Sequence, residues 1–381
     1  METVKIKGGA EAAHEAATTI ANGGIAAFPT ETVYGLGADA FNPGAVAKVY
    51  AAKGRPGDNP LILHVACHDT FYELTESTPP YAHALIKAFW PGPLTLVAKK
   101  MSGLPPWIGG HPKGAADTVG VRMPSHPLAL AVIKESGCVV AAPSANLAGT
   151  PSPTLAEHVA QDFKNGEIDF ILDGGAVPGG LESTVVDVTG PEPVILRPGA
   201  VTAEMVTKVT GFKVHGPSVQ VYEDMKDPVP DIPASNAKKT EMPAAPPRSP
   251  GMKYRHYAPK APMTLLIGSE NSIAAYIINQ CATAKKLRVG VLVTAETESV
   301  LIKGIGCEDQ QIPHLKLITL GCKAAPETIA QNLYASLRKF DTLGVDVIYA
   351  EGLTQDGLGD AIMDRMRKAS EGRLLHIPDL F

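Results

Sequence analysis

The chain has 381 residues, a net charge of −5, 45% hydrophobic residues and 19% charged residues. That length suits two domains better than one, and the composition is typical of globular proteins. The negative charge excludes a protein that coats nucleic acid by bulk electrostatics, and no apolar run approaches the roughly 20 residues that span a bilayer. Residues 1–7 carry no apolar segment behind a basic start, so we expect a cytoplasmic protein without a secretory signal or membrane contact.

Five cysteines are scattered along the chain, and none form a C-x-x-C pair. This pattern predicts free thiols in place of a disulfide framework or a structural zinc site. The charge is uneven: residues 1–205 hold 13 Lys and Arg against 20 Asp and Glu, a net of −7, and residues 206–381 hold 21 against 19, a net of +2. Cations that gather in the first part therefore stand out from an acidic background.

Short apolar runs in the first half of the chain predict strands, at residues 25–28, 61–65, 94–98, 139–142 and 184–188. Segments with helical periodicity lie between them, at residues 46–52, 81–88 and 128–136. This alternation predicts an α/β domain with a twisted mixed sheet, and it places the connecting loops where ligands usually bind in such folds.

A Pro-rich segment separates this part from the rest of the chain. Ten prolines lie between residues 216 and 262, which predicts an extended linker because proline interrupts helices and central strands. Beyond it, strands are expected at 263–267, 288–293 and 345–350, and helices at 273–281, 326–340 and 360–369. We therefore expect a first domain over 1–209, a linker over 210–262 and a smaller Rossmann-like three-layer domain over 263–381.

Five loops combine hydroxyl groups, glycines and isolated cations, at residues 28–39, 53–64, 118–124, 141–152 and 182–199. Lys53 and Arg55 lie among glycines and a proline, and such cations bind phosphate groups. Arg122 lies between apolar neighbours, so it requires an anionic partner, which is either a protein carboxylate or a ligand carboxylate.

Other polar residues of these loops allow two interpretations. Ser144 and Asn146 follow a predicted strand, and either helix capping or ligand binding explains residues of this kind. His64 ends an apolar run, where a lone histidine is usually a core residue. The sequence has no P-loop, G-x-S-x-G elbow, H-E-x-x-H or G-x-G-x-x-G opening a βαβ unit. Cations and hydroxyls without a nucleophile and base suit an anionic ligand such as a nucleotide, held by positioning and electrostatics.

The order and spacing of four motifs resemble the YrdC/Sua5 family of threonylcarbamoyl-AMP synthases over residues 8–205. These motifs are Pro-Thr-Glu-Thr-Val-Tyr-Gly-Leu at 29–36, Lys-Gly-Arg-Pro at 53–56, Ser-Ala-Asn at 144–146 and Glu-Ser-Thr-Val at 182–185. Residues 357–369 look like the Sua5 C-terminal domain, and residues 249–259 look like its linker. One position departs from the family pattern, since Asp364 stands where that pattern has Asn.

This resemblance implies a nucleotidyltransferase that joins L-threonine, bicarbonate or CO2, and ATP into threonylcarbamoyl-AMP and pyrophosphate. The threonine amine would capture CO2 as a carbamate, whose oxygen would attack the α-phosphate, so the protein need not supply a nucleophile. The product would serve the threonylcarbamoyladenosine modification of tRNA, through a downstream threonylcarbamoyl-transferase complex and with a weak contact to tRNA itself.

The resemblance also assigns residues, with Lys53 and Arg55 as the catalytic pair. ATP would be bound by Lys53, Arg55, Asn59, Thr118, Ser144, Asn146, Ser152, Arg197 and Tyr254. Threonine would be bound by Thr32, His64, Arg122 and either Ser183 or Thr184. Mg²⁺ would bridge the phosphates with water as its main ligands and without a metal site of the protein's own. The linker end around Tyr254 would close over the nucleotide.

Two other functions fit fewer features of the sequence. A protein that binds RNA without chemistry would use the same cations, but the acidic first domain has no basic stripe. A carbamoyltransferase of the hydrogenase-maturation type contains a related module, but the cysteine pairs and the acylphosphatase segment of such proteins are absent from this sequence. The sequence leaves the oligomeric state and the role of the second domain open.

Overall fold

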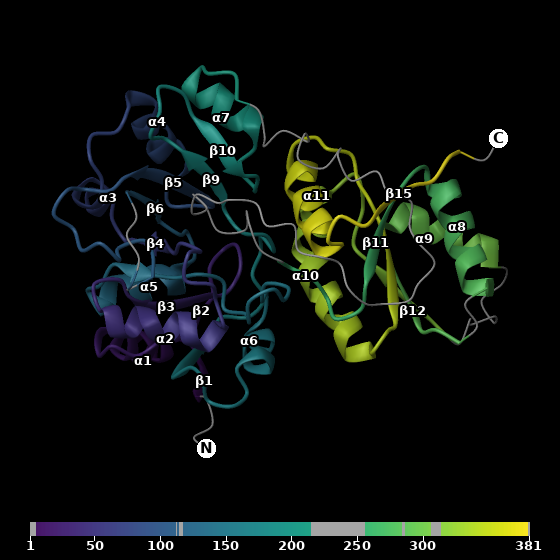
Figure 1. Cartoon of the computed structure of the whole chain (residues 1–381), viewed down its shortest axis with the longest axis horizontal. Helices are drawn as coiled ribbons and strands as arrows, with labels where there is room; N and C mark the ends of the chain where they lie inside the picture. Colours follow the sequence, from purple (N-terminus) through teal and green to yellow (C-terminus); the bar gives the residue numbers. More distant parts are fainter. Residues whose placement is uncertain are drawn as a thin grey trace.

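The computed structural model describes residues 5–111, 113, 117–214, 256–283, 286–305 and 314–379. It contains two α/β domains that lie side by side, the first drawn from purple to teal and the second from green to yellow in Figure 1. The first domain contains a ten-stranded sheet and the second a five-stranded sheet. The predicted α/β class, with a larger mixed sheet followed by a smaller parallel sheet, is confirmed.

The first domain alternates short strands with helices. Its strands are β1 (Lys5–Gly8), β2 (Ala26–Phe28), β3 (Gly35–Asp39), β4 (Ile62–His64), β5 (Leu94–Lys99), β6 (Thr118–Arg122), β7 (Val140–Ala141), β8 (Phe170–Asp173), β9 (Thr184–Asp187) and β10 (Val194–Arg197). Its helices are α1 (Ala10–Ala21), α2 (Pro43–Lys53), α3 (Asp69–Leu74), α4 (Pro80–Phe89), α5 (Pro127–Ser136), α6 (Ala156–Asp162) and α7 (Ala203–Thr210). The sheet order is β1-β8-β2-β3-β7-β4-β6-β5-β9-β10, with both parallel and antiparallel neighbours. Each strand and helix that the sequence predicts here has a counterpart.

Helix α2 shows how the local sequence places a site residue. Its first turn is capped by Asn42, whose Oδ1 accepts hydrogen bonds from two backbone amides, and Pro43 has the fixed φ that suits the first helical position. The helix ends at Gly54, whose φ of 58° is costly for most other residues. Lys53, the last helical residue, is therefore held at a defined point where the chain turns away.

The second domain has a parallel sheet with helices on both faces. Its elements are β11 (Met263–Ile267), α8 (Glu270–Thr283), β12 (Val289–Val293), α9 (Ala295–Ile305), β13 (Leu315–Thr319), α10 (Pro326–Leu343), β14 (Val347–Glu351), α11 (Leu358–Ala369) and β15 (Leu374–His376). The strand order is β13-β12-β14-β11-β15. Helices α10 and α11 lie between this sheet and the first domain, and α8 and α9 lie on the far side (Figure 1). The strands and helices predicted for this part are confirmed.

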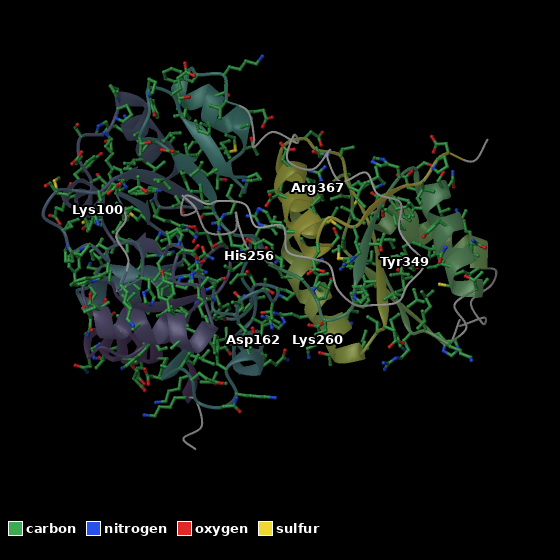
Figure 2. The ribbon with its side chains drawn as sticks, in the orientation of Figure 1. Lys100, Asp162, His256, Lys260, Tyr349 and Arg367 are labelled. Atoms are coloured by element: carbon green, nitrogen blue, oxygen red, sulfur yellow. The ribbon has the colours of Figure 1, made fainter. Side chains whose placement is uncertain are left out.

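The two domains are in direct contact. Val33 and Leu181 of the first domain belong to the same buried apolar cluster as Tyr334 of α10. Arg338, also on α10, donates from both terminal nitrogens to the carboxylate of Asp162, over 3.0 and 2.8 Å. Figure 2 shows Asp162 beside the boundary between the domains. Apolar packing and a bidentate ion pair therefore fix the second domain against the first.

Residues 215–255 lie outside the described part of the chain, and they include Tyr254 and most of the predicted linker. Residues 256–262 lead from that segment into β11. Among the helices that the structure describes, none is both long enough and apolar enough to cross a membrane.

Candidate functional site

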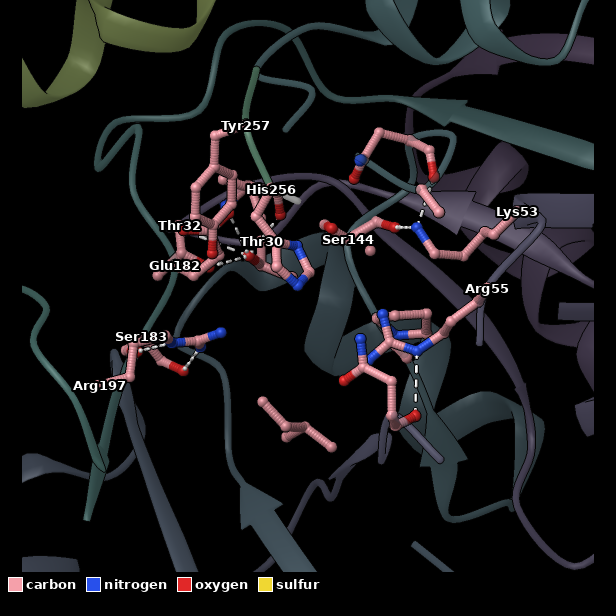
Figure 3. Close-up of a pocket in the computed structure, with 18 of the residues that line it drawn as sticks. Thr30, Thr32, Lys53, Arg55, Ser144, Glu182, Ser183, Arg197, His256 and Tyr257 are labelled. Atoms are coloured by element: carbon pink, nitrogen blue, oxygen red, sulfur yellow. Dashed lines mark hydrogen bonds between the residues drawn. The ribbon is translucent and has the colours of Figure 1, made fainter. Parts of the chain in front are cut away.

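A cavity of about 290 Å³ lies at the loops of the first domain, with His256 and Tyr257 on one wall (Figure 3). This volume is at the lower end of the range of small-molecule sites, roughly 300 to 1,000 Å³. Residues predicted for the site supply much of the lining, namely Thr32, Lys53, Arg55, Asn59, His64, Arg122, Ser144, Asn146, Ser183 and Arg197. The structure thus brings together all five of these loops, which are far apart in the sequence.

Lys53 is buried, and its ammonium group donates hydrogen bonds to the backbone carbonyl oxygens of Ser144 and Asn146. Burial lowers the pKa of Lys53 well below its ordinary value, and the charge of Arg55 lowers it further. The two carbonyl groups orient the ammonium group without neutralising its charge. Lys53 therefore joins helix α2 to the loop that carries Ser144 and Asn146.

Arg55 is likewise a buried cation that donates to neutral backbone carbonyl groups. Its Nε donates to the carbonyl oxygen of Asn59 over 3.2 Å, and its Nη2 donates to that of Pro60 over 2.7 Å. Burial lowers the pKa of Arg55 to about 10, so the guanidinium group remains charged at neutral pH. Asn59 and Asn146 each have a buried side-chain Oδ1 with no hydrogen-bond partner in the structure. Buried acceptors of this kind on a cavity wall are suited to donors of a ligand.

Arg122 has a protein carboxylate as a partner, which is one of the two alternatives that the sequence left open. Its Nη2 donates to Oε1 of Glu31 over 2.6 Å, its Nη1 to the hydroxyl of Thr32 over 3.0 Å, and its Nε to the carbonyl oxygen of Gly92 over 3.3 Å. Burial alone would raise the pKa of Glu31, but the charge of Arg122 and its hydrogen bond hold that pKa below its ordinary value. A guanidinium group has five N–H donors, so two remain for a ligand.

His64 is neutral and has a defined tautomer. Burial, followed by the charge of Arg122, lowers the pKa of His64 to about 3. Its Nδ1 lies 3.2 Å from the carbonyl oxygen of Ile62, and a carbonyl oxygen only accepts, so the proton is on Nδ1. The other ring nitrogen, Nε2, is therefore an acceptor. The apolar run alone favoured a core histidine, and the family resemblance assigned His64 to the threonine site. His64 is buried and it also lines the cavity.

Ser183 and Arg197 form the opposite wall. Arg197 donates from Nε to the carbonyl oxygen of Ser183 over 3.1 Å and from Nη2 to its hydroxyl over 3.2 Å. The Thr184 hydroxyl points away from the cavity, because it donates to the carbonyl oxygen of Val201 and accepts from the amide of Val201. Of the two predicted alternatives, Ser183 lines the cavity and Thr184 does not.

Two predicted ATP contacts, Ser152 and Thr118, are not on the cavity wall, and a third lies outside the described residues. Ser152 is fully buried and lies behind Glu182, to which its hydroxyl donates a hydrogen bond. Thr118 opens β6, four residues before Arg122 and roughly 13 Å from it at the rise of a strand. It lines a separate hollow together with Lys99 and Lys100. Tyr254 lies outside the described residues.

Glu182 is a site residue that the sequence analysis quoted only within a motif. It lines the cavity, and its oxygens accept from the Ser152 hydroxyl, from the Tyr334 hydroxyl over 2.9 Å and from Arg365 Nε over 2.9 Å. Burial opposes its ionisation, but the charges of Arg365 and Arg197 lower the pKa of Glu182 to about 2. Tyr334 and Arg365 belong to α10 and α11, so the second domain holds one cavity residue in place.

His256 and Tyr257 were also missed as individual residues, although they belong to the aromatic and cationic segment 249–259 that predicted a closing lid. The Tyr257 ring lies 5.3 Å from that of Tyr334, and the Arg365 guanidinium lies 5.6 Å above it. Nε2 of His256 is buried without a partner. Figure 2 shows His256 between the two domains, and Figure 3 shows its ring and that of Tyr257 beside the cavity.

Within the described residues, no three His, Cys, Asp or Glu side chains gather in a way that could hold a metal ion. The carboxylate on the cavity wall, Glu182, already accepts from three protein donors. The wall otherwise presents cations, hydroxyls and amide oxygens, which suit an anionic ligand with polar donors of its own.

Two family models match successive parts of the chain. The first, described as "Telomere recombination", matches residues 18–199. The second, described as "Threonylcarbamoyl-AMP synthase, C-terminal domain", matches residues 201–371.

Similar proteins match over nearly their whole length. The threonylcarbamoyl-AMP synthase of Bacillus subtilis is 44% identical over 95% of this chain and 93% of its own, and that of Pyrococcus abyssi is 43% identical over 95% of each. The crystal structure of P. abyssi Sua5 complexed with L-threonine is 40% identical, covers 99% of this chain and 100% of its own, and superposes with a TM-score of 0.81. The chain therefore belongs to the YrdC/Sua5 family of threonylcarbamoyl-AMP synthases, in its two-domain Sua5 form.

Proposed function

We propose that this chain is an L-threonylcarbamoyladenylate synthase, which forms threonylcarbamoyl-AMP and pyrophosphate from L-threonine, bicarbonate or CO2, and ATP. Relatives that carry this name over nearly the full length support the proposal, as does the solved relative that contains L-threonine. In this proposal the product is consumed by a threonylcarbamoyl-transferase complex that modifies tRNA.

The observation that carries the proposal is the way in which the cavity cations are held. Lys53, Arg55 and Arg197 donate to neutral carbonyl groups and hydroxyls, so their charges remain available to a polyanion. Arg122 is instead paired with Glu31, so that end of the cavity is close to neutral. A triphosphate suits the first arrangement, and a zwitterionic amino acid suits the second.

ATP would be bound where these three cations lie. Its phosphates would take hydrogen bonds from Lys53, Arg55 and Arg197, and its amine and hydroxyl donors would satisfy the partnerless amide oxygens of Asn59 and Asn146. The Ser144 hydroxyl lies on the same wall. A magnesium ion would arrive with ATP and keep water ligands, because the Glu182 carboxylate on the cavity wall already accepts from three protein donors. Such an ion would supply charge neutralisation at the phosphates.

Threonine would be bound between Arg122 and His64. The two remaining N–H donors of Arg122 would bind its carboxylate, and Nε2 of His64 would accept from its ammonium or hydroxyl group. The Thr32 hydroxyl lies 3.0 Å from Arg122 and fixes that side chain. Ser183 would close the other side of the pocket.

The chemistry then needs positioning more than a protein nucleophile. The neutral threonine amine adds to CO2, a C–N bond forms, and the amine loses one proton to water to give a carbamate. A carbamate oxygen attacks the α-phosphorus, the bond from that phosphorus to the bridging oxygen breaks, and pyrophosphate leaves with the electron pair. Lys53 and Arg55 stabilise the charge that develops on the phosphates, and the surrounding wall excludes water from a labile mixed anhydride.

The test is pyrophosphate release from ATP with the purified protein, bicarbonate and each amino acid in turn. Release should require both threonine and bicarbonate, and it should fall about a hundredfold or more in Arg55→Ala and Lys53→Ala. Lys48→Ala is the matched control, because Lys48 is exposed on the same helix as Lys53 and its ammonium group donates to the Gly23 carbonyl oxygen, outside the cavity. Threonine-independent release, or equal losses in Lys48→Ala, would contradict the proposal.

A further inference from the structure

Helix α11 carries a buried ionic network against the cavity wall. Nη1 of Arg365 lies 2.6 Å from Oδ2 of Asp364, and Nζ of Lys368 lies 2.7 Å from Oδ1 of the same carboxylate. Nε of Arg365 donates to Glu182 over 2.9 Å. The side chains of Arg365, Asp364 and Lys368 are 0%, 15% and 17% exposed. Two cations and two carboxylates make up this network, so its net charge is zero.

The charges of this network lie close enough to the cavity to act on its lining residues. Glu182 lines the cavity, and the Arg365 guanidinium lies 5.6 Å above the ring of Tyr257, which lines it as well. Burial, followed by the charges of Arg55 and Lys368, lowers the pKa of His256 to about 3, so Lys368 acts electrostatically on a third cavity residue. Charges on α11 therefore act on the same space as the cations of the first domain.

Asp364 supplies the negative charge that balances the two cations of α11, Arg365 and Lys368. Both of its oxygens accept from Lys368, and it is the carboxylate that faces the Nη1 side of Arg365. Nη2 of Arg365 is buried without a partner, so this guanidinium is incompletely bonded even with Asp364 present. Without the Asp364 charge, two cations would remain on α11 against the shared carboxylate of Glu182.

We propose that Asp364 is a positioning residue of the nucleotide site, which holds Arg365 and Lys368 on α11 and thereby limits the affinity for ATP phosphates and pyrophosphate. The inference rests on the proposed function for its substrates. The phosphate end of the cavity, where Lys53, Arg55 and Arg197 face the single carboxylate of Glu182, is already positive. A further unbalanced cation nearby would hold polyanions more tightly, and release of pyrophosphate would become slower.

The first arm of the test uses the full chain with Asp364→Asn, which keeps the shape and removes the charge. The KM for ATP and the dissociation constant of pyrophosphate should both fall, by about three- to tenfold for one charge acting across a partly buried site. The KM for threonine should change less than about twofold, because a zwitterion has no net charge. Asp364→Glu should behave like the unmodified protein. Asp360→Asn is the matched control, since Asp360 lies on the same helix and makes none of the network contacts.

The second arm of the test removes a positive charge in place of a negative one, so the expected change in pyrophosphate affinity has the opposite sign. Lys368→Met leaves the Asp364 charge in place and should weaken pyrophosphate binding, and the double variant Asp364→Asn with Lys368→Met should return it toward the original value. Loss of packing alone would weaken binding in all three variants, so tighter binding in Asp364→Asn separates charge from structure. If Asp364→Asn does not fold, the opposite shift in Lys368→Met still tests the idea.

Pyrophosphate binding measured by calorimetry does not depend on turnover. A wild-type protein that binds pyrophosphate but gives no threonine-dependent release would contradict the proposed function, and the charge inference would still be testable. Unchanged or weaker pyrophosphate binding in folded Asp364→Asn, or binding as tight as in the unmodified protein for Lys368→Met, would overturn the inference.

Discussion

Replacing Glu182 by Gln should destabilise the protein in a way that depends on pH. Each pH unit between the folded and unfolded pKa of a group is worth about 1.4 kcal/mol. The pKa of Glu182 is lowered from 4.5 to about 2, so its ionised form contributes about 3 kcal/mol to the stability of the folded protein. Removing one partner of a buried ion pair costs a similar amount, about 3 to 5 kcal/mol, and the partner left behind, Arg365, is fully buried.

The sign of the pH dependence follows from the depressed pKa. The stabilisation from Glu182 is fully present above its unfolded pKa of 4.5, and it is lost as the pH falls toward the folded value of about 2. A protonated glutamic acid resembles glutamine in shape and charge. The difference between the unmodified protein and Glu182→Gln should therefore be about 3 kcal/mol at pH 7 and should shrink steadily below about pH 4.5.

Urea unfolding followed by circular dichroism measures this difference, because both domains contribute to the signal. The two tryptophans, Trp90 and Trp107, both belong to the first domain, so their fluorescence reports on that domain separately. Glu167→Gln is the control, since Glu167 is an exposed carboxylate that accepts hydrogen bonds from its neighbour Asn165, and it should leave the midpoint almost unchanged. A difference below about 1 kcal/mol at pH 7, or one that does not change with pH, would show that the ion pair is not a net stabiliser.

Two further predictions concern single contacts. His64→Leu removes the acceptor Nε2 and should raise the KM for threonine about tenfold, with little effect on the KM for ATP. Because the pKa of His64 is about 3, the KM for threonine of the unmodified protein should not change with pH near 6.5. A change there would mean that His64 becomes protonated. Gly180→Ala should separate the domains, because its Cβ would lie 2.3 Å from the carbonyl oxygen of Ala330, whereas Gly175→Ala, also at positive φ but with open space, should cost only about 1 kcal/mol. Equal losses in the two alanine variants, measured by urea unfolding, would contradict this reading of the interface.

Local patterns were sufficient for the elements that hold the site. An apolar run predicted β4, and helical periodicity predicted α2, because both signals depend on residues a few positions apart. The glycines and proline around Lys53 and Arg55 favoured a loop whose cations bind phosphate groups. Lys53 instead ends helix α2, and both side chains line the cavity. The motifs at 144–146 and 182–185 likewise contain cavity residues.

Contacts between distant residues could not be predicted in this way. The partners of Glu182 follow it by 152 residues in the case of Tyr334 and by 183 residues in the case of Arg365. No periodicity in the sequence encodes such a pair, since it depends on how the second domain packs. The choice between Ser183 and Thr184 stayed open in the sequence for a local reason. Adjacent residues at the start of a strand point in opposite directions, and the sequence does not tell which one faces inward.

The first domain is acidic as a whole, and yet its cavity is cationic, which requires an explanation in terms of how charge is arranged. Carboxylates that accompany cations elsewhere are replaced around Lys53 and Arg55 by backbone carbonyl groups, which satisfy the N–H donors but leave the charge. The cost appears in the lowered pKa values of both groups, since burial disfavours their charged forms. A polyanion that enters the cavity stabilises these charged forms. Part of its binding free energy therefore comes from offsetting the cost of burying Lys53 and Arg55 as cations. The charge of Arg122, in contrast, is neutralised by its ion pair with Glu31. This difference divides one cavity into a part that suits phosphates and a part that suits an amino acid.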